Sequence, residues 1–212
     1  SNFVLATPDD QVWASVLTRA GHGAPLSAHR TDGYIVRFED GEPKVVIDGL
    51  ISANEFRIDY ARGVLYVNET FAHRTSRFDL SPDGVASNKV VLAQYDENTY
   101  PDGMALDANG DLWVVSIISN RILHVTKTGD VRVLFEDNDA DRMAACAHAL
   151  ATETLTRELV YQTTGAALEN PSSIAFGGPD LKTLYLGSLG GPDLKAFYSP
   201  VAGAPMAHWD WT

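Results

Sequence analysis

The sequence predicts an all-β fold, a β-propeller with about four blades, from two observations. A short apolar strand, a turn rich in Asp, Asn, Gly and Pro, and a second strand with an aromatic residue recur four times in 212 residues. Further strand-like runs follow each repeat. Units of roughly 45 residues with four strands are typical of propeller blades, whereas a β-sandwich has no reason to repeat a motif at this period. The four aromatic residues lie 53, 47 and 72 positions apart: Trp13, Tyr66, Trp113 and Tyr185.

The repeated strand pairs begin near residues 1, 53, 101 and 171, and the blades are expected at about 2–50, 52–96, 100–136 and 170–212. Turns such as SPDG at 81–84 and TGD at 128–130 separate the remaining strands, as hairpins require. A weaker strand pattern lies near 206–209. The outer strands are expected at 33–38, 44–47, 75–80, 89–93, 121–126, 131–135 and 195–198.

Residues 137–169 break the strand pattern. This segment starts with acidic residues and continues with an Ala- and Leu-rich body, DADRMAACAHALATETLTRELVYQ. Acidic residues at the start and helix-forming residues behind them indicate a helix. One or two helices are therefore expected near residues 140–161, as a helical insertion that caps or decorates the propeller.

Composition excludes several classes of protein. The chain carries 16 basic and 28 acidic residues, a formal net charge of −12, which argues against binding to nucleic acid or to an anionic membrane. No apolar run approaches the ~20 residues that cross a bilayer, and the first residues lack a signal-peptide pattern. The single cysteine, Cys146, allows no internal disulfide and fits a reducing compartment, so a cytoplasmic protein is expected.

The residue before the innermost strand of each blade faces the central channel of a propeller. These residues are Asn2, Asn54, Asp102 and Ser172. Two amide oxygens and a carboxylate are hard ligands, which suit Ca²⁺ or Mg²⁺. Asn, Asp and Ser are also common turn formers, so a purely structural role stays open.

Two stretches, YPDGMALDANGDLWVVSIISNRILHVTKTG at 100–129 and NPSSIAFGGPDLKTLYLGS at 170–188, resemble the SMP-30/gluconolactonase/luciferin-regenerating-enzyme family of six-bladed propellers. The resemblance extends over nearly the whole chain. It implies a divalent metal in the channel, held by a Glu, two Asn and an Asp. Asn2, Asn54 and Asp102 match the last three, and Ca²⁺ is expected first, then Zn²⁺ or Mg²⁺. Glu55 stands where many members have Gly, and no residue here matches the family Glu.

The resemblance implies hydrolysis of a sugar lactone or related cyclic ester by a gluconolactonase-like enzyme. A divalent cation would polarise the lactone carbonyl, and Asp102 would be the catalytic base. No G-x-S-x-G motif supports a serine nucleophile, and the six histidines show no spacing typical of a metal site or a triad. Arg19 and Ser172 are the main candidates for substrate binding. Further candidates are His22, Glu69 and Arg74.

The comparison of four repeats with six expected blades predicts a family member that lacks its N-terminal blades and the Glu ligand. The partners expected are then a small-molecule lactone and, at the open edge, the missing blades or a second copy of the chain. Closure as a four-bladed propeller is the structural alternative. The functional alternative is an inactive or non-catalytic propeller fragment that acts as a binding or interaction module.

Overall fold

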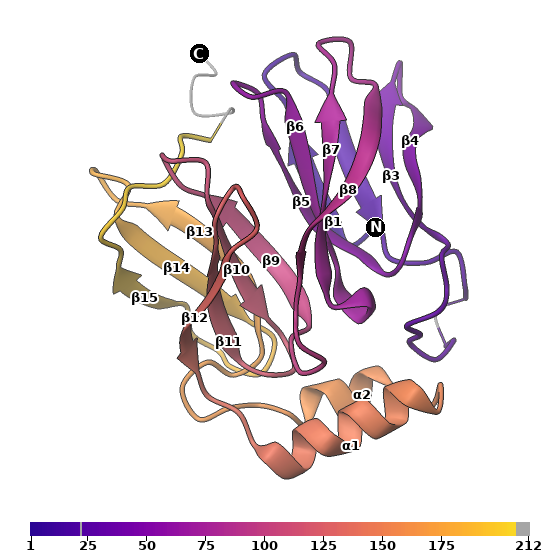
Figure 1. The fold of residues 1–212 in the computed structure, drawn as a ribbon, viewed down its shortest axis with the longest axis vertical. Coiled ribbons are helices and arrows are strands. Elements are labelled where there is room, and N and C mark those ends of the chain that lie inside the picture. Colours follow the sequence, from indigo (N-terminus) through magenta and orange to yellow (C-terminus); the bar gives the residue numbers. More distant parts are fainter. Residues whose placement is uncertain (22, 207–212) are drawn as a thin grey trace.

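A computed structural model describes residues 1–21 and 23–206, and it confirms the all-β propeller. Four antiparallel sheets stand side by side as blades, each with its strands in sequence order (Figure 1). The first blade comprises β1 (Phe3–Ala6), β2 (Val12–Val16), β3 (Gly33–Glu39) and β4 (Glu42–Leu50). The second comprises β5 (Ala53–Asp59), β6 (Val64–Glu69), β7 (Arg74–Leu80) and β8 (Ala86–Gln94), with the 3-10 turn η1 (Thr70–Ala72) between β6 and β7.

The third and fourth blades follow the same order. The third comprises β9 (Pro101–Leu106), β10 (Leu112–Ser116), β11 (Arg121–Val125) and β12 (Val131–Glu136). The fourth has three strands among the described residues, β13 (Pro171–Gly177), β14 (Thr183–Ser188) and β15 (Lys195–Tyr198). The weak pattern near 206–209 lies almost entirely outside the described residues. Strand β9 contacts both β5 and β13, so the first strands of neighbouring blades lie next to one another.

Apolar layers between the blades form most of the core. Trp13 packs with Phe56 between the first two blades, and Tyr66 packs with Met104 between the second and third. Trp113 lies between the third and fourth blades, with its ring centroid 5.7 Å from that of Phe176. The repeated aromatic residue is thus an interblade contact in three blades. The equivalent residue of the fourth blade, Tyr185, is 40% exposed because no described sheet covers the outer face of this blade.

Two helices confirm the predicted insertion, α1 (Ala140–Ala151) and α2 (Arg157–Tyr161). The side chain of Asp139 accepts hydrogen bonds from the first turn of α1, which explains why the acidic run marks the start of this helix. Figure 1 shows both helices together at one end of the sheets. Their buried side chains, including Cys146, pack against Phe71 and Tyr100 beside the start of β9. The insertion therefore covers the end of the blades at which β9 begins.

Loop contacts hold this insertion in place. Leu26 in the β2–β3 loop donates a backbone hydrogen bond of 3.0 Å to the carbonyl of Leu155. The hydroxyl of Ser27 donates to the carboxylate of Glu153 at 2.9 Å. Neither helix is long and apolar enough to cross a bilayer, and the same holds for every helix in the part of the chain that the structure describes.

Candidate metal and substrate site

The first strands of three blades carry a register irregularity near their starts. In β5 the pairing shifts between Ala53 and Phe56, and β9 and β13 show the same shift near Asp102 and Ser172. A bulge of this kind leaves a residue unpaired and re-aims its side chain. Asn54, Asp102 and Ser172 are each the second residue of a strand, and not the residue before it as the sequence predicts. Asn2 precedes β1 as expected.

A chain of hydrogen bonds joins three blades near the starts of their first strands. The Asn2 amide donates to the side-chain oxygen of Asn54. The Asn54 amide donates to the hydroxyl of Thr70 at 2.9 Å, and that hydroxyl donates to the carbonyl of Pro101 at 2.7 Å. Asn54 also hydrogen-bonds the carboxylate of Asp102. Asn2, Asn54 and Asp102 therefore come from three blades to one place, with Asn54 at the centre.

These side chains line a cavity of about 550 Å³, a size suited to a small organic ligand. Asn54 and Asp102 are buried, whereas Asn2 is exposed and Ser172 is half-buried at the rim. The lining combines polar and apolar side chains, which suits a ring that carries both hydroxyls and carbon faces. The polar lining includes Asn2, Asn54, Glu55, Arg57, Asp102 and Ser172, and the apolar lining includes Phe3, Ile174, Tyr185 and Leu194.

The two carboxyl groups of the cavity have strongly raised pKa values. Burial, and then the negative charge of Glu55, raise the pKa of Asp102 to about 8, against the hydrogen bond from Asn54. Burial likewise raises the pKa of Glu55 to about 7, although Arg57 and the backbone N–H of Met104 favour its charged form. A substantial fraction of both groups therefore holds a proton near neutral pH, and a bound cation would favour their charged forms.

The donor set fits a hard divalent cation. It offers carboxylate and amide oxygens, which Ca²⁺ and Mg²⁺ prefer, and its two carboxyl groups outnumber the one guanidinium of the cavity. Among the described residues, Asp102 forms no ion pair with Lys, Arg or His that would compensate its charge. Asn2, Asn54 and Asp102 can therefore hold a metal ion between them.

The other substrate-site candidates lie elsewhere. Arg19 is exposed, pairs with Asp48 at 2.8 Å and stacks over the ring of Tyr34 at 4.1 Å, and it does not line the cavity of Asp102. Glu69 is fully buried and pairs with Arg74 at 2.7 Å. Burial opposes the charged form of Glu69, but Arg74 and neighbouring donors hold its pKa below the usual range. His22 lies outside the described residues.

A second cavity of about 570 Å³ lies where strands β1, β5, β9 and β13 end. Its lining is mostly apolar, with Ile58, Leu106 and Phe176 among its residues. The carboxylate of Asp59 already pairs with Arg62 at 2.6 Å. In the cavity of Asp102, by contrast, no described Lys, Arg or His forms an ion pair with the Asp102 carboxylate.

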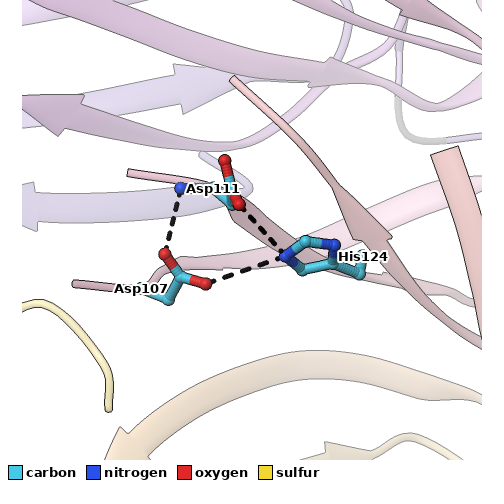
Figure 2. Close-up of side chains that lie close together, drawn as sticks. All are labelled: Asp107, Asp111 and His124. Atoms are coloured by element: carbon cyan, nitrogen blue, oxygen red, sulfur yellow. Dashed lines mark hydrogen bonds and ion pairs between the residues drawn. The ribbon is translucent and has the colours of Figure 1, made fainter. Parts of the chain in front are cut away.

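A further cluster, Asp107, Asp111 and His124, was not found from the sequence. His124 Nε2 lies 3.7 Å from an oxygen of Asp107 and 3.4 Å from an oxygen of Asp111 (Figure 2). The ligand atoms lie within 4.8 Å of one another, close enough to share a metal ion. His124 reaches the two aspartates because it pairs with Trp113 across strands β10 and β11. The spacing of histidines along the chain does not reveal this cross-strand pairing.

Comparison with known proteins agrees with this architecture. The family model for an SMP-30/gluconolactonase/LRE-like region matches residues 1–156. YvrE of Bacillus subtilis (strain 168), which carries the name of a sugar lactone lactonase, is 25% identical over 189 residues, 87% of this chain and 52% of its own length. Pentonolactonase XacC of Haloferax volcanii is 25% identical over 187 residues, again 87% and 52%. The chain thus spans about half the length of these relatives.

Solved structures show the same fold. A luciferin-regenerating enzyme superposes with a TM-score of 0.70 at 18% identity, over 97% of this chain and 64% of that one. The calcium-binding protein regucalcin from Agrobacterium tumefaciens gives a TM-score of 0.63 at 16% identity, over 96% and 61%. Since the family model matches well over half of the chain, this protein belongs to the SMP-30/gluconolactonase/LRE-like family.

Proposed function

We propose that the cavity of Asp102 is the site of a metal-dependent hydrolase that opens a sugar lactone or a related cyclic ester. The convergence of Asn2, Asn54 and Asp102 from three blades on one cavity carries the proposal. Lactonase names among the relatives support the substrate class, and the calcium-binding neighbour supports Ca²⁺ ahead of Zn²⁺ or Mg²⁺. We also propose a cytoplasmic location, on the single free and buried thiol of Cys146, which cell fractionation would test.

The side chains divide the work as follows. Asn2 and Asn54 would orient the cation without adding charge, and Asp102 would supply the anionic ligand. When bound, the cation supplies polarisation of the lactone carbonyl. Asp102 would accept a proton from water as the water oxygen bonds to the carbonyl carbon, and the proton would pass to the ring oxygen as the ring carbon–oxygen bond breaks. Ser172 at the rim offers a hydroxyl to a substrate hydroxyl.

Asp102→Asn tests this function because it keeps the shape of the side chain and removes both the charge and the base. Hydrolysis of glucono-lactone and pentono-lactones would be followed in a pH-stat with Ca²⁺, Zn²⁺ or Mg²⁺. We expect the variant to lose about 10²–10⁴-fold in rate. Asp40→Asn, a matched change at an exposed aspartate outside both acidic sites, should keep the wild-type rate. Equal rates for Asp102→Asn and the unaltered chain would refute the proposal.

A second candidate function is that of a non-catalytic interaction module. The observation that favours it is the uncovered face of the fourth blade, where Tyr185 is 40% and Tyr198 is 68% exposed. An exposed apolar sheet face is typical of an interaction surface. A propeller that binds no cation, hydrolyses no lactone and forms a dimer through this face in light scattering would support the second candidate over the first.

A further inference from the structure

We propose that Glu55 is a second carboxylate ligand of the cation in the channel, so that the site joins two acidic side chains from neighbouring blades. The proposal rests on the cation of the proposed function and adds a ligand to it. No metal role for Glu55 follows from its position in the sequence. The geometry of the bulge, of Gly103 and of Arg57 carries the inference.

The bulge in β5 explains how two adjacent residues reach one cavity. Neighbouring side chains of a regular strand point to opposite faces, so Asn54 and Glu55 would normally diverge. The register shift between Ala53 and Phe56 removes this alternation locally. Both Asn54 and Glu55 line the cavity of Asp102, and Glu55 is only 4% exposed. Its carboxylate also acts electrostatically on Asp102.

Gly103 leaves the space that the Glu55 carboxylate uses. A Cβ atom at this position would lie 3.0 Å from Oε2 of Glu55 and 2.6 Å from the Cα atom of Ser173. Gly103 directly follows Asp102, so this space lies on the strand that carries Asp102. A side chain here would crowd Glu55 and the fourth blade, so glycine lets the Glu55 carboxylate approach the strand that carries Asp102.

Arg57 fixes the orientation of Glu55 and sets the charge of the site. Its guanidinium pairs with Oε1 of Glu55 and lies 4.6 Å from the ring centroid of Phe3. It also donates to the carbonyl of Phe56 at 3.1 Å. Two carboxylates and one guanidinium leave the cavity with one net negative charge when both acids are ionised. Without Glu55, the buried guanidinium would oppose a divalent cation beside Asp102.

A purely structural reading makes Glu55 only the partner of Arg57, and a set of variants separates the two. Calcium affinity of the whole chain would be measured by isothermal titration for Glu55→Gln, Arg57→Gln and the double variant Glu55→Gln/Arg57→Gln. The double variant removes the ion pair as a unit and leaves no unpaired charge. Thermal melts without cation would confirm that each variant folds.

If Glu55 is a ligand, both Glu55→Gln and the double variant should bind Ca²⁺ at least tenfold more weakly than the unaltered chain, and Arg57→Gln should bind it no more weakly. Wild-type affinity in the folded double variant would overturn the proposal. Gly103→Ala, which crowds the Glu55 carboxylate, gives a second test and should also weaken binding.

Asp102→Asn tells the two failures apart. If Asp102→Asn loses binding while the double variant keeps it, the proposed site stands and the role of Glu55 is refuted. If the unaltered chain binds none of Ca²⁺, Mg²⁺ and Zn²⁺ in the titration, the metal-dependent function and the role of Glu55 both fail. Asp40→Asn, at an exposed aspartate outside both acidic sites, serves as the control and should titrate like the unaltered chain.

Discussion

Asp102 and Asp107 stand at opposite ends of strand β9, and both carboxylates are buried. Asp107 is 2% exposed and its oxygens accept hydrogen bonds from the backbone N–H groups of Asn109 and Asp111, at 2.8 and 3.0 Å. The indole of Trp113 donates to it at 3.3 Å. Asp102 is 9% exposed, receives one hydrogen bond from the Asn54 side chain, and faces the like charge of Glu55.

The two carboxylates differ in the number of hydrogen-bond donors that surround them. The donors around Asp107 satisfy its oxygens as hydrogen-bond acceptors, and they also close the turn between β9 and β10. Around Asp102 the surroundings oppose the charge, which raises its pKa to about 8. A buried carboxylate with donors holds a fold together, whereas one without them attracts a proton or a cation. Burial alone therefore does not distinguish a structural aspartate from a ligand.

Replacing Asp107 should cause the largest loss of stability. Asp107→Ala leaves two backbone N–H groups and the Trp113 indole without their acceptor, and we expect the free energy of unfolding to fall by about 3 kcal/mol. Urea denaturation without cation would measure it. Asp111→Ala is the control, because it keeps the Asp107 carboxylate as acceptor and loses the hydrogen bond from the backbone N–H of Lys127. A loss below about 1 kcal/mol for Asp107→Ala would show that water replaces the carboxylate in this turn.

The next largest expected effect is stabilisation by added calcium, which should depend on Asp102 at one end of β9 and not on the acidic residues at the other end. A cation that binds only the folded chain stabilises it by about 2.7 kcal/mol when present at a hundred times its dissociation constant. We expect this gain in the unaltered chain and none in Asp102→Asn, as measured by thermal melts with Ca²⁺ and with a chelator. Loss of the gain in Asp111→Asn, with retention in Asp102→Asn, would move the cation to the other end of the strand.

Sequence patterns predict the blades well because strand alternation, turn residues and interblade aromatics are local features. Trp13, Tyr66 and Trp113 all lie between blades, as their repetition indicates. The approach of Asn2, Asn54 and Asp102 follows from the same repetition, since equivalent positions of blades meet at the axis. The metal-binding roles of these residues stay predictions.

Other parts of the site depend on information that spacing along the chain does not contain. Strand alternation places Glu55 opposite Asn54, and only the bulge turns it into the same cavity. His124 reaches Asp107 through pairing across β10 and β11. Arg19 precedes a long loop, whose path decides that its guanidinium pairs with Asp48. Bulges, cross-strand neighbours and loop paths are tertiary features.

A smaller expected effect is the pH dependence of the stability of the folded chain, which should come from the carboxyl groups of the Asp102 cavity. The pKa values of Asp102 and Glu55 are raised to about 8 and about 7, so the folded chain binds more protons than the unfolded chain between pH 5 and 8. The stability of the cation-free protein must then fall as pH rises through this window. We expect a fall of at least about 1.4 kcal/mol, the equivalent of one pKa unit.

Asp102→Asn should reduce this pH dependence to the part that comes from Glu55, and make the cation-free protein more stable than the unaltered chain at pH 8, with little difference at pH 5. Asp40→Asn, at an exposed aspartate away from both acidic sites, should keep the full slope. Urea denaturation at pH 5, 6, 7 and 8 with a chelator present would measure both. A stability that rises over this window would mean that neither carboxylate keeps its proton in the folded chain.

His124 offers the smallest and most discriminating test of the comparison. Its ring lies 5.6 Å from that of Trp113, edge to face, and its Nε2 atom faces two carboxylates. If Asp107 is held by its backbone donors, His124→Gln should cost about 1 kcal/mol or less, since one polar group replaces another on a partly exposed strand. Zn²⁺ is the appropriate probe because imidazole binds it well. A zinc-dependent rise in melting temperature that disappears in His124→Gln and persists in Asp102→Asn would show a second metal site at the turn after β9. Hydrogen bonds from backbone donors to a buried carboxylate would then not exclude metal binding by that carboxylate.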